Sequence, residues 1–282
     1  MMDLTDVGAT AFLTLAARVL ESQTAVPIIH DPEAVRLYEA IKPMLANQKG
    51  KLYRMIVEEK LPPMLAVTVS QRARRFDRYV RDFLQRQPNG VVVNLGCGLD
   101  TRFQRLDDGQ LVLYDLDLPE MIAVKRTLVA ENERYRLLAA SVLDIDWMQE
   151  LREGGKRPFL FLAEGLFMYL LPDDVKRVVL SLQMAFPGCE LVAEVFNGRW
   201  LHGWRGRMTR RKMQRDLGIG DDASFRSGLT SSNEMEQWHP GITFLDDWSY
   251  FDDDEPKLGL LRLFRHIELF RKMQWVVHYK LS

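Results

Sequence analysis

The stretch VVVNLGCGLDTR, residues 91–102, decides the fold of this chain. Its first five residues form an apolar run with the length and composition of a buried β-strand. Gly96 and Gly98 follow directly, and because glycine has no Cβ, the backbone of this loop can pass close to a ligand. A buried strand that ends in a glycine loop indicates a nucleoside-binding site at the edge of an α/β sheet.

The sequence after this loop continues the pattern. Short apolar runs alternate with segments of helical periodicity, which predicts a mostly parallel sheet with crossover helices. The predicted strands are residues 91–95, 111–115, 135–140, 159–164 and 190–196, and the predicted helices between them are 118–130, 147–151 and 173–186. The tail, residues 273–282, alternates and is rich in β-formers, which predicts a final strand.

Two further segments flank or interrupt this domain. Residues 1–90 show apolar side chains three and four apart in four places, 11–20, 34–41, 52–57 and 76–84, which predicts an N-terminal helical extension. Residues 91–282 then form the ligand-binding domain. From about 197 to 254 its rhythm breaks, with glycines, charge runs and four tryptophans, and we interpret this segment as a cap inserted over the carboxyl edge of the sheet.

Composition excludes several classes of protein. The chain has 282 residues, 47% of them hydrophobic, and a formal net charge of -1, which is typical of a packed globular protein without general affinity for nucleic acid. The two cysteines, Cys97 and Cys189, have neither disulfide nor metal-site spacing, so no metal is expected. A basic leader is lacking, and so is an apolar run of about 20 residues, so we expect a cytoplasmic protein without a membrane span.

The glycine loop has acidic partners on the next strand. A dinucleotide fingerprint would require a third glycine where Thr101 stands, which argues against a pyrophosphate ligand and a nicotinamide-dependent oxidoreductase. Asp115 and Asp117 end the strand LVLYDLD at the position from which a carboxylate accepts ribose hydroxyls. We assign this role to Asp117, whereas Asp115 could equally cap the helix that starts at Pro119.

Two more elements follow along the chain. In SVLDIDW, residues 141–147, a side-chain oxygen and apolar neighbours could hold an adenine, although Asp144 could also be a plain helix cap. Glu164 ends an apolar strand at the same sheet edge, and a carboxylate buried there needs a cation. The ammonium and sulfonium of S-adenosylmethionine (AdoMet) would serve, and an ion pair with an arginine is the alternative.

These elements, in this order, resemble the leucine carboxyl methyltransferase-like family, which includes protein phosphatase methyltransferases and bacterial polyketide carboxyl O-methyltransferases. The likeness covers nearly the whole chain. It rests on NLGCGLDTR (residues 94–102) with DLDLP (115–119), and on ATAFLTLAARVLES (9–22), HDPEA (30–34), VSQRARRFDRYV (69–80), SVLDIDW (141–147) and AEGLFMYL (163–170).

The resemblance implies a Rossmann-like class I methyltransferase fold, with a seven-stranded sheet, helices on both faces, a late antiparallel strand and an added cap. It also implies roles: Arg18 and Arg72 for the methionyl carboxylate, Glu164 for the amino group, and Ser141 with Val142 for the adenine. The predicted cofactor site comprises Arg18, Arg72, Asn94, Gly96, Cys97, Gly98, Asp115, Asp117, Leu118, Ser141, Val142, Asp144, Glu164 and Gly165.

The acceptor is less constrained by sequence. We expect O-methylation of a carboxylate or hydroxyl of a small molecule; a protein C-terminal carboxylate and a non-catalytic AdoMet-binding protein are the alternatives. A carboxylate needs no general base, whereas a hydroxyl needs one, and the candidates are Tyr169, His202 and His239. The basic run 199–215 could attract an acidic substrate or simply be a solvated helix face. The sequence predicts no oligomeric state.

Overall fold

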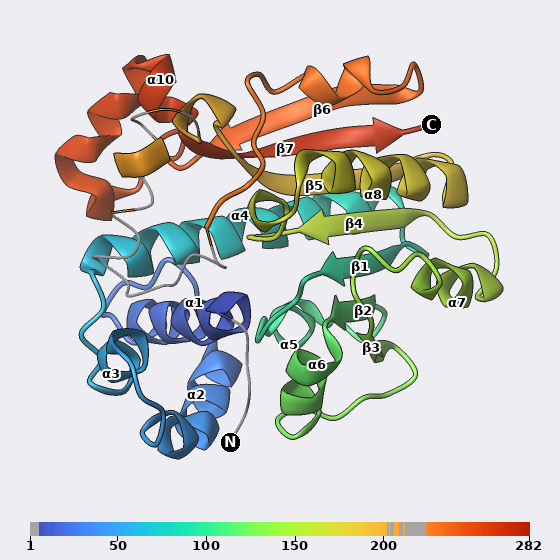
Figure 1. The fold of residues 1–282 in the computed structure, drawn as a ribbon. Helices are drawn as coiled ribbons and strands as arrows, with labels where there is room; N and C mark the ends of the chain where they lie inside the picture. Colours follow the sequence, from blue (N-terminus) through green and yellow to red (C-terminus); the bar gives the residue numbers. More distant parts are fainter. Residues whose placement is uncertain (1–5, 202, 204–205, 209–210, 212–223) are drawn as a thin grey trace.

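The computed structural model describes residues 6–201, 203, 206–208, 211 and 224–282. Its centre is a seven-stranded sheet with the strand order β3-β2-β1-β4-β5-β7-β6 (Figure 1). Strands β1 to β5 run parallel to one another. Strand β7 pairs antiparallel with β5, and β6 pairs antiparallel with β7. The strands are β1 Val91–Leu95, β2 Val112–Asp117, β3 Tyr135–Ala139, β4 Phe159–Ala163, β5 Cys189–Phe196, β6 Ile242–Ser249 and β7 Gln274–Leu281.

Helices cover both faces of this sheet, because β1 and β4 are buried along their whole length and need apolar cover on each side. The core on one face includes residues of α5 (Arg102–Leu106) and α6 (Pro119–Arg126). The core on the other face includes residues of α7 (Trp147–Glu153) and α8 (Pro172–Ala185). The predicted α/β class, the strands and the crossover helices are therefore confirmed.

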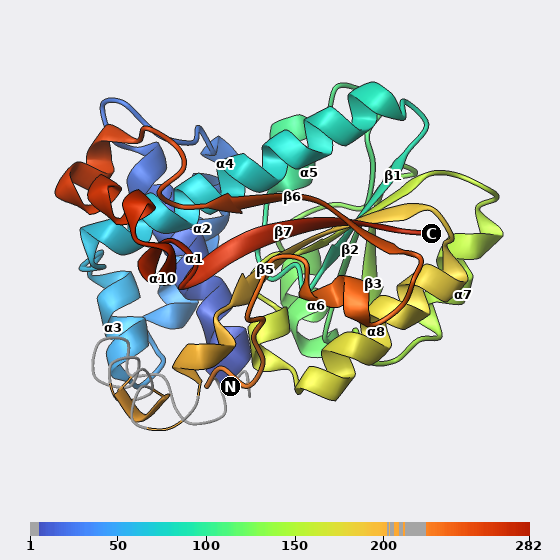
Figure 2. The same cartoon turned by 90° about the horizontal axis from the view of Figure 1, so that it is seen from above.

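The N-terminal extension is helical, as predicted. It consists of α1 (Asp6–Ser22), α2 (Pro32–Leu45), α3 (Lys51–Val57) and α4 (Pro63–Arg86). Figure 2 shows α1, α2 and α3 gathered at one end of the sheet, with α4 running across it. The extension shares its apolar core with one face of the sheet, so α1 reaches the carboxyl ends of the parallel strands.

The segment expected to be a cap, residues 197–254, contains a strand that sequence analysis missed. This is β6, the edge strand, which pairs with β7. A register shift between Phe244 and Asp246 breaks the alternation of the pattern ITFLDDWS and leaves Leu245 exposed. The short helices in this segment are η2 (Gly198–Trp200) and η4 (Glu234–Gln237). Between β6 and β7 the chain forms η5 (Pro256–His266) and α10 (Glu268–Arg271).

None of the helices in the described part of the chain is long and apolar enough to cross a membrane. Within the same residues, histidine, cysteine and acidic side chains do not form a group that could hold a metal ion.

Candidate active site

A cavity of about 1010 Å³ opens at the carboxyl ends of the parallel strands. Its floor is built by residues in the last positions of β1, β2 and β5 and directly after β1, β2 and β4, since parallel strands bring these ends to one side of the sheet. The helical extension supplies one wall through α1 and α4, and Trp200, Met208, Arg211 and Phe225 of the expected cap supply another. Residues from the first part of the segment interpreted as a cap therefore border the cavity.

The loop after β1 needs glycine at two positions. Gly96 and Gly98 have φ angles of 66° and 47°, which side-chain-bearing residues rarely adopt. A Cβ on Gly96 would lie 2.8 Å from Leu166 Cδ1, and one on Gly98 would lie 3.0 Å from the Ala11 Cβ. The missing side chains thus keep the cavity open where α1 and the loop after β4 approach.

Asp117 stands at the end of β2 with its carboxylate fixed by the backbone. The amide of Gly98 donates to its Oδ2 and the amide of Leu118 to its Oδ1, both at 2.7 Å. Burial raises the pKa of the Asp117 carboxyl, and the two amides oppose this. The carboxylate lines the cavity and can accept further hydrogen bonds from a ligand.

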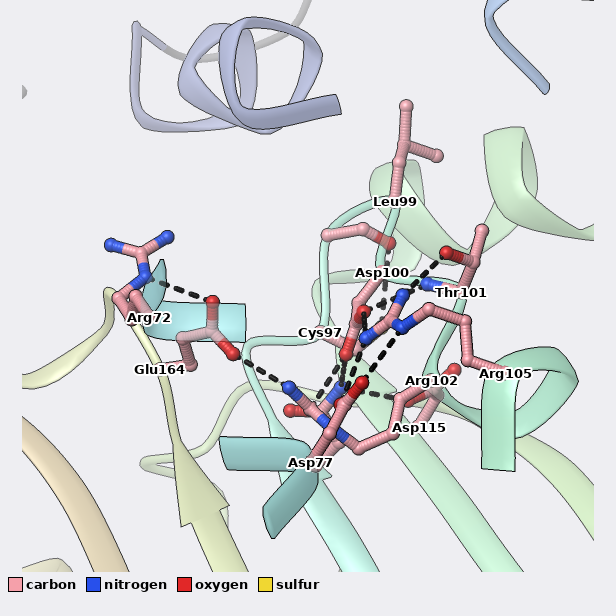
Figure 3. A network of polar contacts seen from close by, with 12 residues as sticks. Arg72, Asp77, Cys97, Leu99, Asp100, Thr101, Arg102, Arg105, Asp115 and Glu164 are labelled. Carbon is pink, nitrogen blue, oxygen red and sulfur yellow. Dashed lines mark hydrogen bonds and ion pairs between the residues drawn. The ribbon is translucent and has the colours of Figure 1, made fainter. Parts of the chain in front are cut away.

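Glu164 lies between two arginines (Figure 3). It accepts hydrogen bonds from Arg72 Nε at 2.8 Å and from Arg102 Nη2 at 2.7 Å. Burial opposes ionisation, but the two guanidiniums hold the pKa of Glu164 below its usual value. Both the cavity-lining position and the arginine ion pair considered from the sequence are therefore present.

The ion pairs continue on both sides of Glu164. Arg102, which is almost fully buried, also pairs with Asp77 and Asp100 at 2.9 and 2.6 Å. Arg105 joins these two aspartates to Asp31. Arg18 pairs with Asp31 at 3.1 Å and donates to the carbonyl of Leu99. Thr101, at the position of the missing glycine, donates its hydroxyl to Asp31, so its side chain serves this network.

The structure brings ten of the fourteen predicted cofactor residues to the cavity. These are Arg18, Arg72, Asn94, Gly96, Cys97, Gly98, Asp117, Leu118, Glu164 and Gly165.

Asp115 is not among them. Asp115 precedes Asp117 by two residues in β2. Lys125 Nζ pairs with its carboxylate at 2.7 Å, and Tyr135 and Asn94 donate hydrogen bonds to it. These partners occupy both oxygens, so Asp115 neither faces the cavity nor caps α6. It holds Asn94 and the buried lysine in place under the site.

The segment predicted to hold an adenine is also outside the cavity lining. Val142 packs in the core with α7 and α8, and Ser141 Oγ accepts from the amide of Leu143. Asp144 borders a separate surface groove. It is not a helix cap either, because the N-cap position of α7 is Asp146, whose side chain makes no capping hydrogen bond.

Of the two candidate bases that the structure describes, Tyr169 lines the cavity and His239 does not. Burial raises the pKa of its phenol to about 12, so Tyr169 is a neutral hydrogen-bonding group near pH 7. His239 is exposed and contacts Gln183 near the start of β6, at the end of the strands opposite the cavity. His202 lies outside the described residues.

Several residues of the site had no assignment from the sequence. Asp100 lines the cavity and lies within the glycine-loop motif itself, while Leu65, Val69, Phe196, Phe225 and Met273 supply apolar walls. Glu194, fully buried in β5, accepts from Arg72 Nη1 at 2.8 Å. A glutamate inside the apolar run ELVAEVF was the available signal, because a charge in a buried strand requires a partner.

The fold and this site together define the class. A parallel sheet that ends in two antiparallel strands, a glycine loop after β1 and an acid at the end of β2 are the features of a class I AdoMet-dependent methyltransferase. The chain belongs to the leucine carboxyl methyltransferase family, whose model matches residues 11–183. It is an AdoMet-dependent methyltransferase.

Comparisons with known proteins agree on this class. The chain is 29% identical to the tetracenomycin polyketide synthesis O-methyltransferase TcmP of Streptomyces glaucescens, over 88% of this chain and 85% of that protein. It is 32% identical to an S-adenosyl-L-methionine-dependent methyltransferase of Mycolicibacterium gilvum, named as putative, over 79% and 78% of the two chains. The fold matches the crystal structure of a putative methyltransferase from Thermobifida fusca, with a TM-score of 0.58, 18% identity and coverage of 88% and 94%.

Proposed function

We propose that this enzyme transfers the methyl group of AdoMet to a carboxylate of a small, largely apolar molecule. The observation that carries the proposal is the composition of the part of the cavity that lies away from the ion pairs of Glu164. That part is walled by aromatic and aliphatic side chains, among them Phe196, Trp200 and Phe225, and the described residues that line the cavity include no histidine. A carboxylate acceptor fits such a site, because it is already ionised and needs no general base.

The cofactor would occupy the end of the cavity near the glycine loop. Asp117, at the end of β2, would accept the ribose hydroxyls, and Gly96 and Gly98 would let the ligand approach the backbone. Glu164 would accept from the methionyl ammonium. Arg72 lines the cavity with its Nε and Nη1 held by glutamates, and its Nη2 would donate to the methionyl carboxylate.

Arg18 has a more limited role in this proposal. Its Nε is paired with Asp31, and its Nη2 donates to Leu99, so most of its hydrogen-bonding capacity is used within the protein. We therefore assign Arg18 mainly to holding the loop after β1 against α1. Arg72 remains the principal contact for the methionyl carboxylate.

The volume of the cavity leaves space for an acceptor. Pockets for drug-sized ligands occupy about 300–1,000 Å³, so a cavity of about 1010 Å³ can hold a nucleoside cofactor and a second molecule. Arg211 of the cap lines the cavity and would attract an acidic acceptor. The apolar walls would exclude water from the reacting groups.

The chemistry demands little more from the protein. AdoMet supplies a methyl group bound to a positively charged sulfur, which is the electrophile of an in-line displacement. The protein has to align the acceptor oxygen with it and keep water out. Tyr169, neutral near pH 7, would donate a hydrogen bond to the acceptor carboxylate instead of removing a proton. TcmP, which is named for polyketide synthesis O-methylation, supports a small-molecule acceptor.

A product-stability assay tests the proposal. The enzyme is incubated with AdoMet carrying a labelled methyl group and with matched sets of polycyclic aromatic acids, their phenolic counterparts and tRNA. We expect label in the acids only, released as methanol by mild alkali, because esters hydrolyse and ethers do not. Alkali-stable label in the phenols, or label in tRNA with both small-molecule sets unmodified, would overturn it.

A further inference from the structure

The ion pairs around the cofactor end of the cavity form one continuous chain with unequal numbers of charges. Among the described residues it contains four guanidiniums and five carboxylates, all with side chains no more than 12% exposed. The guanidiniums are those of Arg18, Arg72, Arg102 and Arg105, and the carboxylates are those of Asp31, Asp77, Asp100, Glu164 and Glu194. The chain therefore carries one buried negative charge in excess.

Glu194 is the carboxylate at the end of this chain. It shares a single guanidinium, that of Arg72, whereas Glu164 shares two. Its other hydrogen bonds come from neutral groups: the hydroxyl of Tyr250, and Gln274 Nε2 at 2.6 Å. Three donors thus point at the Glu194 carboxylate, which suits a group that accepts hydrogen bonds at both oxygens.

Glu194 lies directly behind the cavity wall. A Cβ built on Gly165 would be 3.7 Å from Glu194 Oε2, and Gly165 itself lines the cavity. Arg72 and Gln274, which both donate to Glu194, line it as well. In the interior of a protein, where the polarity is low, such an unbalanced negative charge favours binding of a cationic ligand, because burying an ion without a counter-charge is costly.

We propose that Glu194 is a specificity-determining residue that makes the site prefer the cationic cofactor to its neutral product. AdoMet carries a sulfonium, an ammonium and a carboxylate, a net charge of +1, which balances the excess charge of the chain. S-adenosylhomocysteine has lost the sulfonium charge and has a net charge of zero, so once the neutral ester has left, the excess charge of the chain has no counter-charge in the complex with the product. Glu194 thereby favours release of the product. This inference rests on the placement of the cofactor at this end of the cavity.

Binding of two unreactive ligands tests the proposal without turnover. Sinefungin carries an amine in place of the methylsulfonium and keeps the net charge of +1, and S-adenosylhomocysteine is neutral. Calorimetry gives the ratio of their dissociation constants in the wild-type protein and in Glu194→Gln. We expect the substitution to lower the preference for sinefungin by about tenfold, the order expected for one partly screened buried charge. A loss of packing alone would weaken both ligands equally.

The same strand supplies a matched control. Glu190 is also a buried glutamate of β5 paired with an arginine of α4, but it lies at the opposite end of the strand. Glu190→Gln should leave the ratio of the two dissociation constants unchanged. A second variant, Gln274→Lys, keeps Glu194 and places an ammonium beside it, so it should shift the ratio in the same direction as Glu194→Gln even if that variant fails to fold.

Two outcomes would overturn the inference. One is a ratio that stays within twofold of wild type in either folded variant, Glu194→Gln or Gln274→Lys. The other is an equal shift in Glu190→Gln, which would show that the charge acts without regard to place. Failure of the acceptor proposal looks different, because the ligand ratio would still respond to Glu194 while no acid is methylated.

Discussion

Helix α4 is joined to strand β5 by an arginine–glutamate pair at each end of the sheet, and the two pairs differ in what surrounds them. At the cavity end, Arg72 and Glu194 are 11% and 0% exposed, and Arg72 also holds Glu164. At the opposite end, Arg86 is 51% exposed and binds both oxygens of Glu190, which also contacts His278.

The difference shows that the same pairing chemistry can serve two purposes. The Arg86–Glu190 pair lies next to solvent, extends among the described residues no further than His278, and joins a helix to the sheet. The Arg72–Glu194 pair continues through Glu164 into a buried chain of charges that borders the cavity. The carboxyl edge of the sheet decides which pair can take part in binding, since only there do the strand ends leave space for a ligand.

The largest effect should follow from breaking the buried chain at its centre. Arg102 is 1% exposed and pairs with Asp77, Asp100 and Glu164, so Arg102→Met would leave three carboxylates short of a counter-charge. We expect a loss of about 3–5 kcal/mol in the free energy of unfolding, measured by urea denaturation. Arg86→Met, at the opposite end of α4, should cost about 1 kcal/mol or less because Arg86 is half exposed. Equal losses would contradict the comparison.

The next effect concerns the cofactor. Asp117→Ala removes the proposed ribose acceptor and should weaken AdoMet binding by about 1–3 kcal/mol, measured by calorimetry. Glu190→Gln serves as the control and should bind AdoMet like the wild type, because its pair lies at the far edge. An unchanged affinity in Asp117→Ala would remove this residue from the binding site.

Acidification should separate the same two ends of the sheet. Burial raises the pKa of Asp117, so AdoMet binding, which uses the ionised form, should weaken as the pH falls and should begin to do so above the usual range for an aspartate. Asp117→Asn should lack this dependence while its overall affinity is lower. Binding isotherms between neutral pH and the onset of acid unfolding give the comparison.

At the far end the effect of acid is on stability. Burial opposes ionisation of Glu190, but hydrogen bonds from Arg86 and His278 lower its pKa from 4.5 to about 2. The carboxylate therefore stabilises the fold above about pH 4.5, and this contribution is lost as the pH falls toward 2. Glu190→Gln should flatten the stability curve in that window, by about 1 kcal/mol or less for a pair with a half-exposed arginine. A curve parallel to that of wild type would contradict this.

A last effect, also small, tests the glycine loop. Gly98→Ala places a Cβ at a φ of 47° and 3.0 Å from the Ala11 Cβ, which should cost about 1 kcal/mol of stability and also reduce AdoMet affinity. Gly155 also has a positive φ, 90°, but a Cβ there meets nothing within 4 Å. Gly155→Ala should lower stability by a similar amount and leave AdoMet affinity unchanged. The same loss of affinity in both variants would show that the loop acts only through stability.

Much of the fold could be predicted from the sequence because its signals are local. A buried parallel strand is a short apolar run, and a crossover helix repeats with a period near 3.6 residues, so β1, β4 and α8 lie within a residue or so of where the patterns placed them. The edge strand β6 was missed because its bulge at Leu245 breaks the alternation on which strand prediction depends.

The candidate site was predictable where geometry follows from the chain itself. Gly96, Gly98, Asp117 and Glu164 all stand at the end of a strand, and parallel strands bring these ends together whatever the details of packing. Arg72 came only from the family resemblance, since nothing in a helix rich in arginines distinguishes the one that faces a cavity.

What the sequence by itself determined is therefore the sheet, the glycine loop after residues 91–95 and the set of acids at the carboxyl edge. What only the tertiary structure decided is which of those acids remain available. Asp115 and Asp117 are two residues apart on one strand, yet Lys125 pairs with the first, whereas the second accepts from the backbone amides of Gly98 and Leu118. Ion pairs of the site join residues far apart in the sequence, 122 positions in the case of Arg72 and Glu194, and a local pattern carries no information about contacts at that separation.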